Sequence, residues 1–252
     1  MKECVLITGA AKNTGRVTAQ LFAEKGLNVI LTARKGEDVQ LAAKEIATKT
    51  NTTVIGIEFN QGETDTIVPL FEKIEEMGFV VSQLIMNAAA PGMDCDALNV
   101  SEEEWSAVIH TNVVGGFLCA RESARRMIKY NVKGSILFVG SNTAYHAIRN
   151  RSSYIASKGA LASLVKALTL DFGGYGIRVN CLLPGPIHTD RWDALTEEQI
   201  AFRRNRAPLK KEAQTIDIAN AIYYLSSELS ANTTGAELII DGGMHVQLHP
   251  SM

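Results

Sequence analysis

The stretch TGAAKNTGR, residues 8–16, follows the apolar run CVLI at residues 4–7 and leads into a segment with helical periodicity. In a turn between a strand and a helix, free backbone N–H groups and the helix dipole attract an anion. Gly9 and Gly15 lack a Cβ, so a pyrophosphate can approach the backbone there. The stretch therefore predicts the first strand–helix unit of a dinucleotide-binding fold.

Asn13 stands where such a turn often carries a middle glycine. Asparagine is the non-glycine residue that best tolerates a left-handed backbone, so we expect the turn to keep its shape. Taken alone, the stretch would also fit an ordinary loop with two glycines. The rest of the chain has to decide between these two interpretations.

Apolar runs rich in Val, Ile and Leu alternate with amphipathic segments along the whole sequence. This alternation predicts an α/β fold: a doubly wound parallel sheet of about seven strands, flanked by helices, with a ligand crevice at the carboxyl ends of the strands. We expect strands at residues 4–10, 28–34, 53–59, 82–89, 134–141, 177–185 and 236–241. We expect helices at 15–26, 37–50, about 65–77, 101–130, 153–173 and 215–229, the first ending at Gly26.

Length and composition exclude several classes of protein. With 252 residues and no linker-like composition, the chain is expected to form a single domain over residues 1–252. A formal net charge of -2 argues against a nucleic-acid partner, and no apolar run is long enough to span a bilayer. The four scattered cysteines are typical of buried residues in a reducing cytoplasm. The five histidines show no zinc-like spacing, so no metal is expected.

Several motifs occur in the order that is typical of one enzyme family, and the chain resembles the short-chain dehydrogenase/reductase family over nearly its full length. The glycine-rich turn resembles the family's TGxxxGxG, and Tyr154-x-x-x-Lys158 follows Ser141 by thirteen residues. Two departures are Asn13 in the turn and Ala89 where the family's NAG has glycine. The other matching blocks are NAA at 87–89, Asn112 in HTNVVG, PGPIHT at 184–189 and IDGG at 240–243.

The resemblance implies hydride transfer between nicotinamide C4 and a carbonyl or secondary alcohol. Tyr154 and Lys158 lie four residues apart on one helix face, where the ammonium of Lys158 should lower the pKa of the phenol towards neutrality. Tyr154 would then act as general acid or base while Ser141 orients the substrate oxygen. By the same resemblance, Lys158 binds the nicotinamide ribose. Asn112 bends its helix and holds a water through which Lys158 exchanges protons.

The sequence after the second expected strand, LTARKGED at 31–38, bears on the choice of dinucleotide. Ala33 stands where an NAD enzyme usually has an acid, and Arg34 follows it. A guanidinium suits a 2′-phosphate, and Lys12 would assist it, so NADP(H) is favoured over NAD(H), with Glu37 and Asp38 as the opposing signal. The full set of expected cofactor contacts is Gly9, Lys12, Asn13, Thr14, Gly15, Arg34, Asn60, Asn87, Ala88, Tyr154, Lys158, Pro184, Gly185, Ile187 and Thr189, with Asn60 beside the adenine and Ile187 and Thr189 on the carboxamide.

Three questions stay open at this stage. The substrate is unspecified, although the loop at 143–152 and an Arg-rich lid at about 188–211 should wall its pocket, and 3-oxoacyl thioesters, sugars and steroids all fit. Enoyl reductases of the family space Tyr and Lys more widely, and an NADP(H) sensor without turnover would usually lack one of them. The helix at 153–173 is apolar around much of its circumference, which predicts a homo-oligomer, a tetramer or a dimer.

Overall fold

The computed structural model describes residues 1–247, in which seven parallel strands form one sheet in the order β3-β2-β1-β4-β5-β6-β7. Each strand is a run of mostly apolar residues, and most are buried along their length because helices cover both sides of the sheet. The strands are β1 (Lys2–Ile7), β2 (Val29–Ala33), β3 (Val54–Glu58), β4 (Phe79–Met86), β5 (Ser135–Val139), β6 (Arg178–Pro184) and β7 (Glu237–Ile240).

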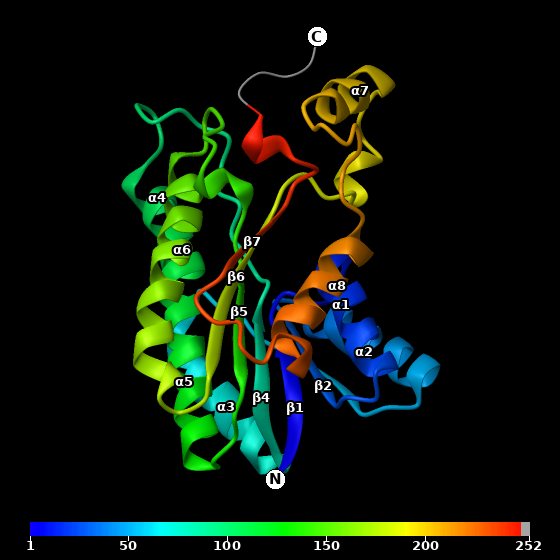
Figure 1. Ribbon diagram of the computed structural model, residues 1–252, viewed down its shortest axis with the longest axis vertical. Coiled ribbons are helices and arrows are strands. Elements are labelled where there is room, and N and C mark those ends of the chain that lie inside the picture. Colours follow the sequence, from blue (N-terminus) through cyan, green and yellow to red (C-terminus); the bar gives the residue numbers. More distant parts are fainter. Residues whose placement is uncertain (248–252) are drawn as a thin grey trace.

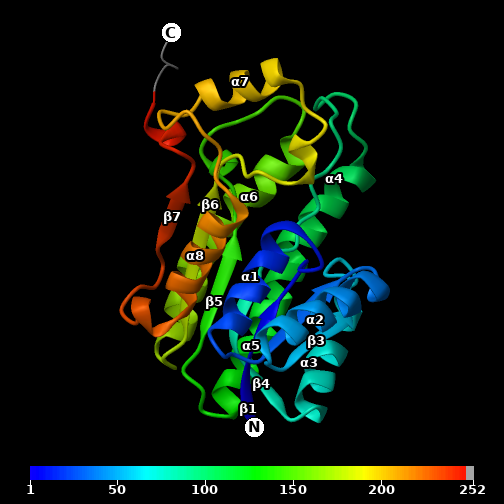
Figure 2. The same ribbon diagram turned by 90° about the vertical axis from the view of Figure 1, so that its right-hand side faces the viewer.

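Most of the helices form two layers, one on each face of the sheet, while α7 lies beyond one end of the sheet (Figures 1 and 2). One core cluster joins the sheet to α1, α2 and α8, and the other joins it to α3, α5 and α6. The α-helices are α1 (Asn13–Glu24), α2 (Gly36–Thr50), α3 (Ile67–Glu76), α4 (Glu102–Ile109), α5 (Gly116–Lys129), α6 (Ser152–Gly173), α7 (Glu197–Asn205) and α8 (Thr215–Ser226).

The predicted fold class is confirmed, and the expected strands and helices differ from the observed ones mainly at their ends. Helix α1 ends as expected, because Lys25 is its C-cap and Gly26 follows with a positive φ of 82°. None of the helices within residues 1–247 combines the length and the apolar character that a membrane span requires.

Two segments are described more fully by the structure than by the sequence. The long helix expected at 101–130 is present, and its middle part is a π-helical segment, His110–Gly115, which contains Asn112 and joins α4 to α5. The polar, Arg-rich lid region at 188–211 contains the short turn Asp190–Trp192 and helix α7. A capping box formed by Thr196 and Gln199 begins α7, and this pair was the sequence signal that could have located it.

Candidate functional site

The crevice lies where the strand order reverses, between β1 and β4, whose carboxyl ends are side by side. Connections leave these two strands towards opposite faces of the sheet, which opens a space above their ends. The turn at residues 8–15 and the segment at 87–90 both emerge there. The sheet therefore places the two expected cofactor loops next to each other.

The phosphate turn has no room for side chains at its two glycines. A Cβ on Gly9, whose φ is 65°, would lie 2.8 Å from Ala88 Cα, and one on Gly15 would lie 2.6 Å from the Gly9 carbonyl oxygen. Asn87 Nδ2 donates to the carbonyl oxygens of Thr8 and Gly9, both at 3.0 Å, and fixes the turn to the end of β4. The two glycines let the turn pack tightly against the end of β4, and this compact turn, the glycine cradle, leads directly into the N-terminus of α1, where a dinucleotide pyrophosphate fits.

Asn13 has a φ of 51°, the left-handed backbone expected of the residue in the middle-glycine position. Helix α1 begins there without a side-chain cap and without an acidic residue in its first turn, so its N-terminal N–H groups are available to an anion. Asn13 Nδ2 also donates to Asp190 Oδ2 at 3.4 Å. This contact joins the phosphate turn to the start of the lid.

The ends of β2 and β3, where the adenosine of a dinucleotide is expected, carry one basic and one acidic side chain, Arg34 and Glu58. Arg34 is exposed directly after β2, as expected. Glu58, which the sequence analysis did not single out, ends the neighbouring strand β3 opposite Ala33, and its carboxylate reaches the start of α2 beside Gly36. The amide of Asn60 is engaged in a local turn, donating to Glu63 Oε1 at 2.8 Å and accepting from Gly62 N at 3.2 Å.

Ser141, Tyr154 and Lys158 meet beyond the carboxyl end of β5. Ser141 is buried and accepts a hydrogen bond from Thr143 N at 3.2 Å. Lys158, one helical turn after Tyr154, places its Nζ 5.6 Å from the centre of the Tyr154 ring. The same Nζ donates to the Val139 carbonyl oxygen at 2.8 Å, which anchors the lysine to the end of β5.

The electrostatics of this group differ from the expectation. Burial raises the pKa of Tyr154, and the hydrogen bond from Ser141 and the positive charges of Arg191 and Arg151 oppose that rise without cancelling it. Burial also lowers the pKa of Lys158 to about 8. The expected lowering of the Tyr154 pKa by Lys158 is therefore absent, since the ammonium is directed at a backbone carbonyl.

Asn112 lies in the π-helical segment and is buried. Its Oδ1 accepts from Ala90 N at 2.7 Å, and its Nδ2 donates to Ala90 O at 2.9 Å and to Ser157 Oγ at 3.0 Å. A single amide thus connects the loop after β4 to the helix that carries Tyr154 and Lys158. The side chain positions these elements, and its expected role towards a water stays a prediction.

The segment expected to hold the carboxamide follows β6, whose last residue is Pro184. Gly185 N donates to Ile240 O at 2.8 Å, and a Cβ on Gly185 would lie 2.6 Å from Asp241 Cβ, so this glycine is required by packing. Ile187 pairs with Ala213, and the Thr189 carbonyl oxygen accepts from Trp192 N at 2.7 Å. These contacts fix the backbone on both sides of the expected carboxamide site.

A buried carboxylate holds the lid. Glu212 accepts from Arg204 Nε and Nη2 at 2.7 and 2.8 Å and is paired with His188 Nδ1 at 3.0 Å. His188 in turn stacks on Trp192, with 5.6 Å between the ring centres. These contacts connect both ends of the lid to α7. They were not predicted from the sequence, because His188, Arg204 and Glu212 are not adjacent in the chain.

No group of three or more His, Cys, Asp or Glu in residues 1–247 could hold a metal ion. His249, one of the histidines considered in the sequence, lies outside the described residues.

Comparison with known proteins agrees with this geometry. A family model described as Enoyl-(Acyl carrier protein) reductase matches residues 9–245. The 3-oxoacyl-(acyl-carrier-protein) reductase FabG of Aquifex aeolicus is 30% identical over 95% of this chain and 96% of its own. Acetoin dehydrogenase YohF from Salmonella typhimurium superposes with a TM-score of 0.87 at 27% identity, covering 98% of each chain. A 4-hydroxyisoleucine dehydrogenase, complexed with NADH and succinate, gives 0.86 at 28% identity, covering 96% of this chain and 100% of its own.

The doubly wound sheet, the glycine cradle and the Ser–Tyr–Lys group together define a nicotinamide-dependent oxidoreductase, which acts on a CH–OH or C=O group by hydride transfer. The chain belongs to the short-chain dehydrogenase/reductase family.

The lid network yields a test of stability against pH. Hydrogen bonding from Arg204, with a smaller contribution from His188, lowers the pKa of Glu212 from 4.5 to about 2. A depressed carboxylate pKa stabilises the fold above the unfolded value, and this contribution is lost as the pH falls towards about 2. Glu212→Gln should reduce the free energy of unfolding at pH 7 by about 1.5–3 kcal/mol, measured by urea denaturation.

The difference in the free energy of unfolding between wild type and Glu212→Gln should become smaller as the pH drops below about 4.5. Glu72→Gln on the exposed side of α3 is the matched control and should leave the free energy of unfolding nearly unchanged. If Glu212→Gln lowered the free energy of unfolding equally at pH 7 and pH 3, the pairing of Glu212 with Arg204 would be contradicted.

Proposed function

We propose that the chain is an NADP(H)-dependent dehydrogenase/reductase in which Tyr154 exchanges the proton with the substrate oxygen. The observation that carries this proposal is the grouping of Ser141, Tyr154 and Lys158 beyond the carboxyl end of β5, where Lys158 is buried with its Nζ 5.6 Å from the centre of the Tyr154 ring. The hydroxyls of Tyr154 and Ser141 can both contact the carbonyl oxygen of a substrate. Tyr154 would donate the proton, and Ser141 would orient the oxygen.

A bound nicotinamide dinucleotide would supply or accept the hydride. The cradle of Gly9 and Gly15 would hold its pyrophosphate, and Ile187 and Thr189 would hold its carboxamide. Lys158 would hold the nicotinamide ribose, and its pKa of about 8 leaves it mostly protonated at neutral pH. During reduction Tyr154 gives its proton to the substrate oxygen, and during oxidation it takes that proton back. Because burial raises the pKa of Tyr154, the hydroxyl is protonated at neutral pH, the state that reduction requires.

The alternative functions considered from the sequence predict different substrates or no turnover. The matching family description names an enoyl reductase, but a tyrosine and a lysine four residues apart favour carbonyl over enoyl chemistry by family resemblance. A 3-oxoacyl thioester is the substrate class named for the Aquifex relative. A dinucleotide sensor would bind NADP(H) and turn over no carbonyl compound, and the complete Ser–Tyr–Lys group argues against it.

We assign the cofactor preference to Arg34, with help from Lys12. Arg34 is exposed next to the start of α2, and it has no hydrogen-bonding or ionic partner within residues 1–247, so its guanidinium is available to a 2′-phosphate. The opposing group is Glu58, whose carboxylate would repel that phosphate. The similar 4-hydroxyisoleucine dehydrogenase is complexed with NADH, which supports a nicotinamide dinucleotide without deciding between NAD(H) and NADP(H).

We also propose that the protein forms a homo-oligomer through α5 and α6 and works in the cytoplasm. The outward side of α6 carries small and apolar residues, with Leu170 85% exposed, and Ile128 on α5 is 42% exposed. Apolar surface of this kind is typically covered by a second subunit. The four free cysteines are in keeping with a reducing compartment.

The catalytic proposal predicts the effect of Tyr154→Phe. Loss of the proton donor should lower turnover of a carbonyl substrate by at least about 10²-fold, while the dissociation constant for the dinucleotide stays close to the wild-type value. Steady-state kinetics and fluorescence titration measure the two quantities. Tyr175→Phe, which alters an exposed tyrosine, should behave as wild type. Near-normal turnover by Tyr154→Phe would remove Tyr154 from the mechanism.

The cofactor proposal predicts a selective effect at Arg34. Charge-assisted hydrogen bonds of about 1.5–3 kcal/mol correspond to roughly tenfold to hundredfold in affinity, so Arg34→Ala should weaken NADPH binding by that factor and leave NADH binding nearly unchanged. Asn13→Gly is the matched comparison, because Asn13 faces the pyrophosphate that both dinucleotides share, and it should alter both affinities by a similar factor. Tighter binding of NADH than NADPH by the wild type would contradict the proposal.

The assembly proposal predicts a mass of two or four times 27.3 kDa in solution. Light scattering at micromolar concentration measures it. Ala167→Glu, on the exposed side of α6, should shift the mass towards that of one chain because it places a charge in the apolar surface. A wild-type protein that is monomeric under these conditions would exclude the proposed interface.

A further inference from the structure

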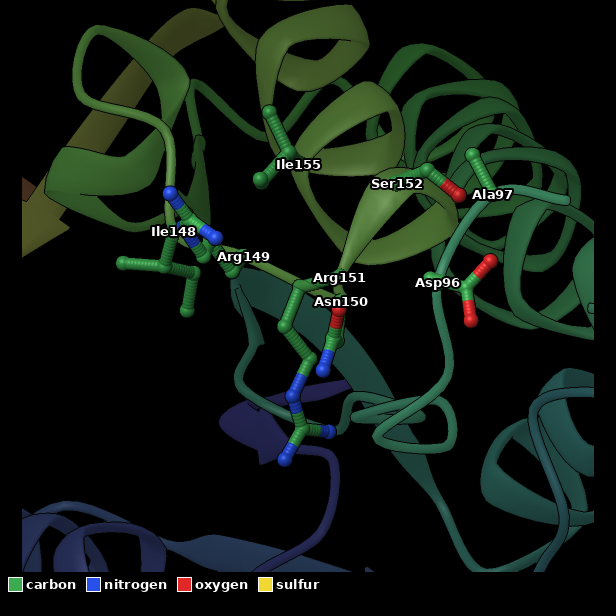
Figure 3. A pocket seen from close by; sticks show the side chains of 8 residues that line it. All are labelled: Asp96, Ala97, Ile148, Arg149, Asn150, Arg151, Ser152 and Ile155. Atoms are coloured by element: carbon green, nitrogen blue, oxygen red, sulfur yellow. The ribbon is translucent and has the colours of Figure 1, made fainter.

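A cavity of about 400 Å³ opens at the N-terminal end of α6, next to the proposed proton donor. It is lined by residues 148–151 of the loop before α6, by Ser152 and Ile155 of α6, and by Asp96 and Ala97 of the segment after β4 (Figure 3). Ile155 and Ser152 are the lining residues closest in sequence to Tyr154, one residue after it and two before it. Its size is in the range of small-molecule sites.

Arg151 is fixed at the edge of this cavity. Its Nη1 donates to the carbonyl oxygens of Pro91 and Gly92 at 3.2 and 3.0 Å, and the remaining donors have only a distant carboxylate, Asp94, at 3.9 Å from Nη2. Figure 3 shows its side chain extended from the start of α6, with the guanidinium group at the far end. Arg151 is therefore held in place by backbone contacts while much of its hydrogen-bonding capacity stays unused.

The acidic residue of the cavity does not neutralise Arg151. Asp96 accepts from Leu98 N at 2.9 Å and from Asn99 Nδ2 at 2.7 Å, so its two oxygens are occupied by its own loop. Arg149, a second lining arginine, has no hydrogen-bonding or ionic partner among residues 1–247. The cavity wall thus carries an excess of positive charge.

A further arginine approaches from the lid. Arg191, exposed on the turn that follows Thr189, also lacks a hydrogen-bonding or ionic partner in the described part of the chain. Its neighbour Asp190 points to Asn13 in the phosphate turn and so does not pair with it. Arg191 thus lies on the lid turn that contacts the phosphate turn, and the positive charges of Arg191 and Arg151 both lower the pKa of the Tyr154 hydroxyl, against the larger effect of burial.

We propose that the substrate is a secondary alcohol or ketone that carries an anionic group, a carboxylate or a phosphate ester, bound between Arg151 and Arg191. Planar guanidinium groups bind such oxyanions through paired N–H donors. In the oxidation, the hydrogen of the alcohol C–H bond would leave with its electron pair as a hydride to an oxidised nicotinamide, and Tyr154 would take the hydroxyl proton in its phenolate form. The proposal rests on the proposed function above, and it extends that function to the substrate class.

The test compares matched substrates with and without charge. The probes are 2-, 3- and 4-hydroxy acids, each beside its methyl ester, and the corresponding phosphate-bearing alcohols, all assayed for dinucleotide reduction. Wild type should oxidise at least one anionic probe with a kcat/KM about tenfold or more above that of its neutral partner. The carboxylate and phosphate series identify which oxyanion is preferred.

Arg191→Gln should lower kcat/KM for the preferred anion by about tenfold to hundredfold and change the neutral partner by less than about threefold. Arg191 is the informative position, since Arg151 also supports the loop at 91–92. Arg206→Gln, which removes an equal charge at the end of α7, is the control and should match wild type. Equal kcat/KM for acids and esters in the wild type, or an equal loss of both in Arg191→Gln, would overturn the proposal.

A binding measurement distinguishes failure of the proposed function from failure of the proposed anion site. If no probe is oxidised, calorimetric titration of the same anions against wild type and Arg191→Gln still tests the site. Binding that Arg191→Gln weakens tenfold or more would support the anion site and refute the proposed turnover. Equal binding, or none to either protein, would overturn the anion site itself.

Discussion

The close approach of the first turn to the end of β4 is the contact on which the site depends. Gly9 lies so near Ala88 that a single added carbon would collide with the backbone, and Asn87 holds the two segments together through two carbonyl oxygens. This contact lies where the strand order reverses, at the carboxyl ends of β1 and β4, whose connections lead to opposite faces of the sheet. The cradle, the crevice and the position of β5 beside it all follow from that arrangement.

The reacting group is built differently from the cradle, by long-range contacts between rigid elements. Ser141 is placed by the end of β5, and Tyr154 and Lys158 by one face of α6. Lys158 returns to β5 through the Val139 carbonyl, and Asn112 connects α6 to the loop after β4. Strands and helices position these side chains. Loop motion therefore changes the distances between them less than it changes the position of the lid.

Local sequence was sufficient for the parts of the structure that depend on local chemistry. The strands, the left-handed backbone at Asn13 and the glycine after α1 were predicted because periodicity and residue type determine them. The arrangement of Glu212 with Arg204 and His188 was not predicted, since the three come together only in the folded chain. The same reason explains Glu58 beside α2, the carbonyl partner of Lys158, and the burial that raises the pKa of Tyr154 where a lowering was expected.

The π-helical segment between α4 and α5 makes this part of the chain sensitive to counting. An α-helix advances the direction of its side chains by about 100° per residue, and a π-helical turn advances it by less because it holds more residues. The π-helical segment can therefore take up one extra residue while Cys119, Ser123 and Met127, which form the buried row of α5, still face the sheet. A deletion here would restore regular α-helical pairing and keep that row buried, but it would remove the irregular turn that holds Asn112 against Ala90 and Ser157.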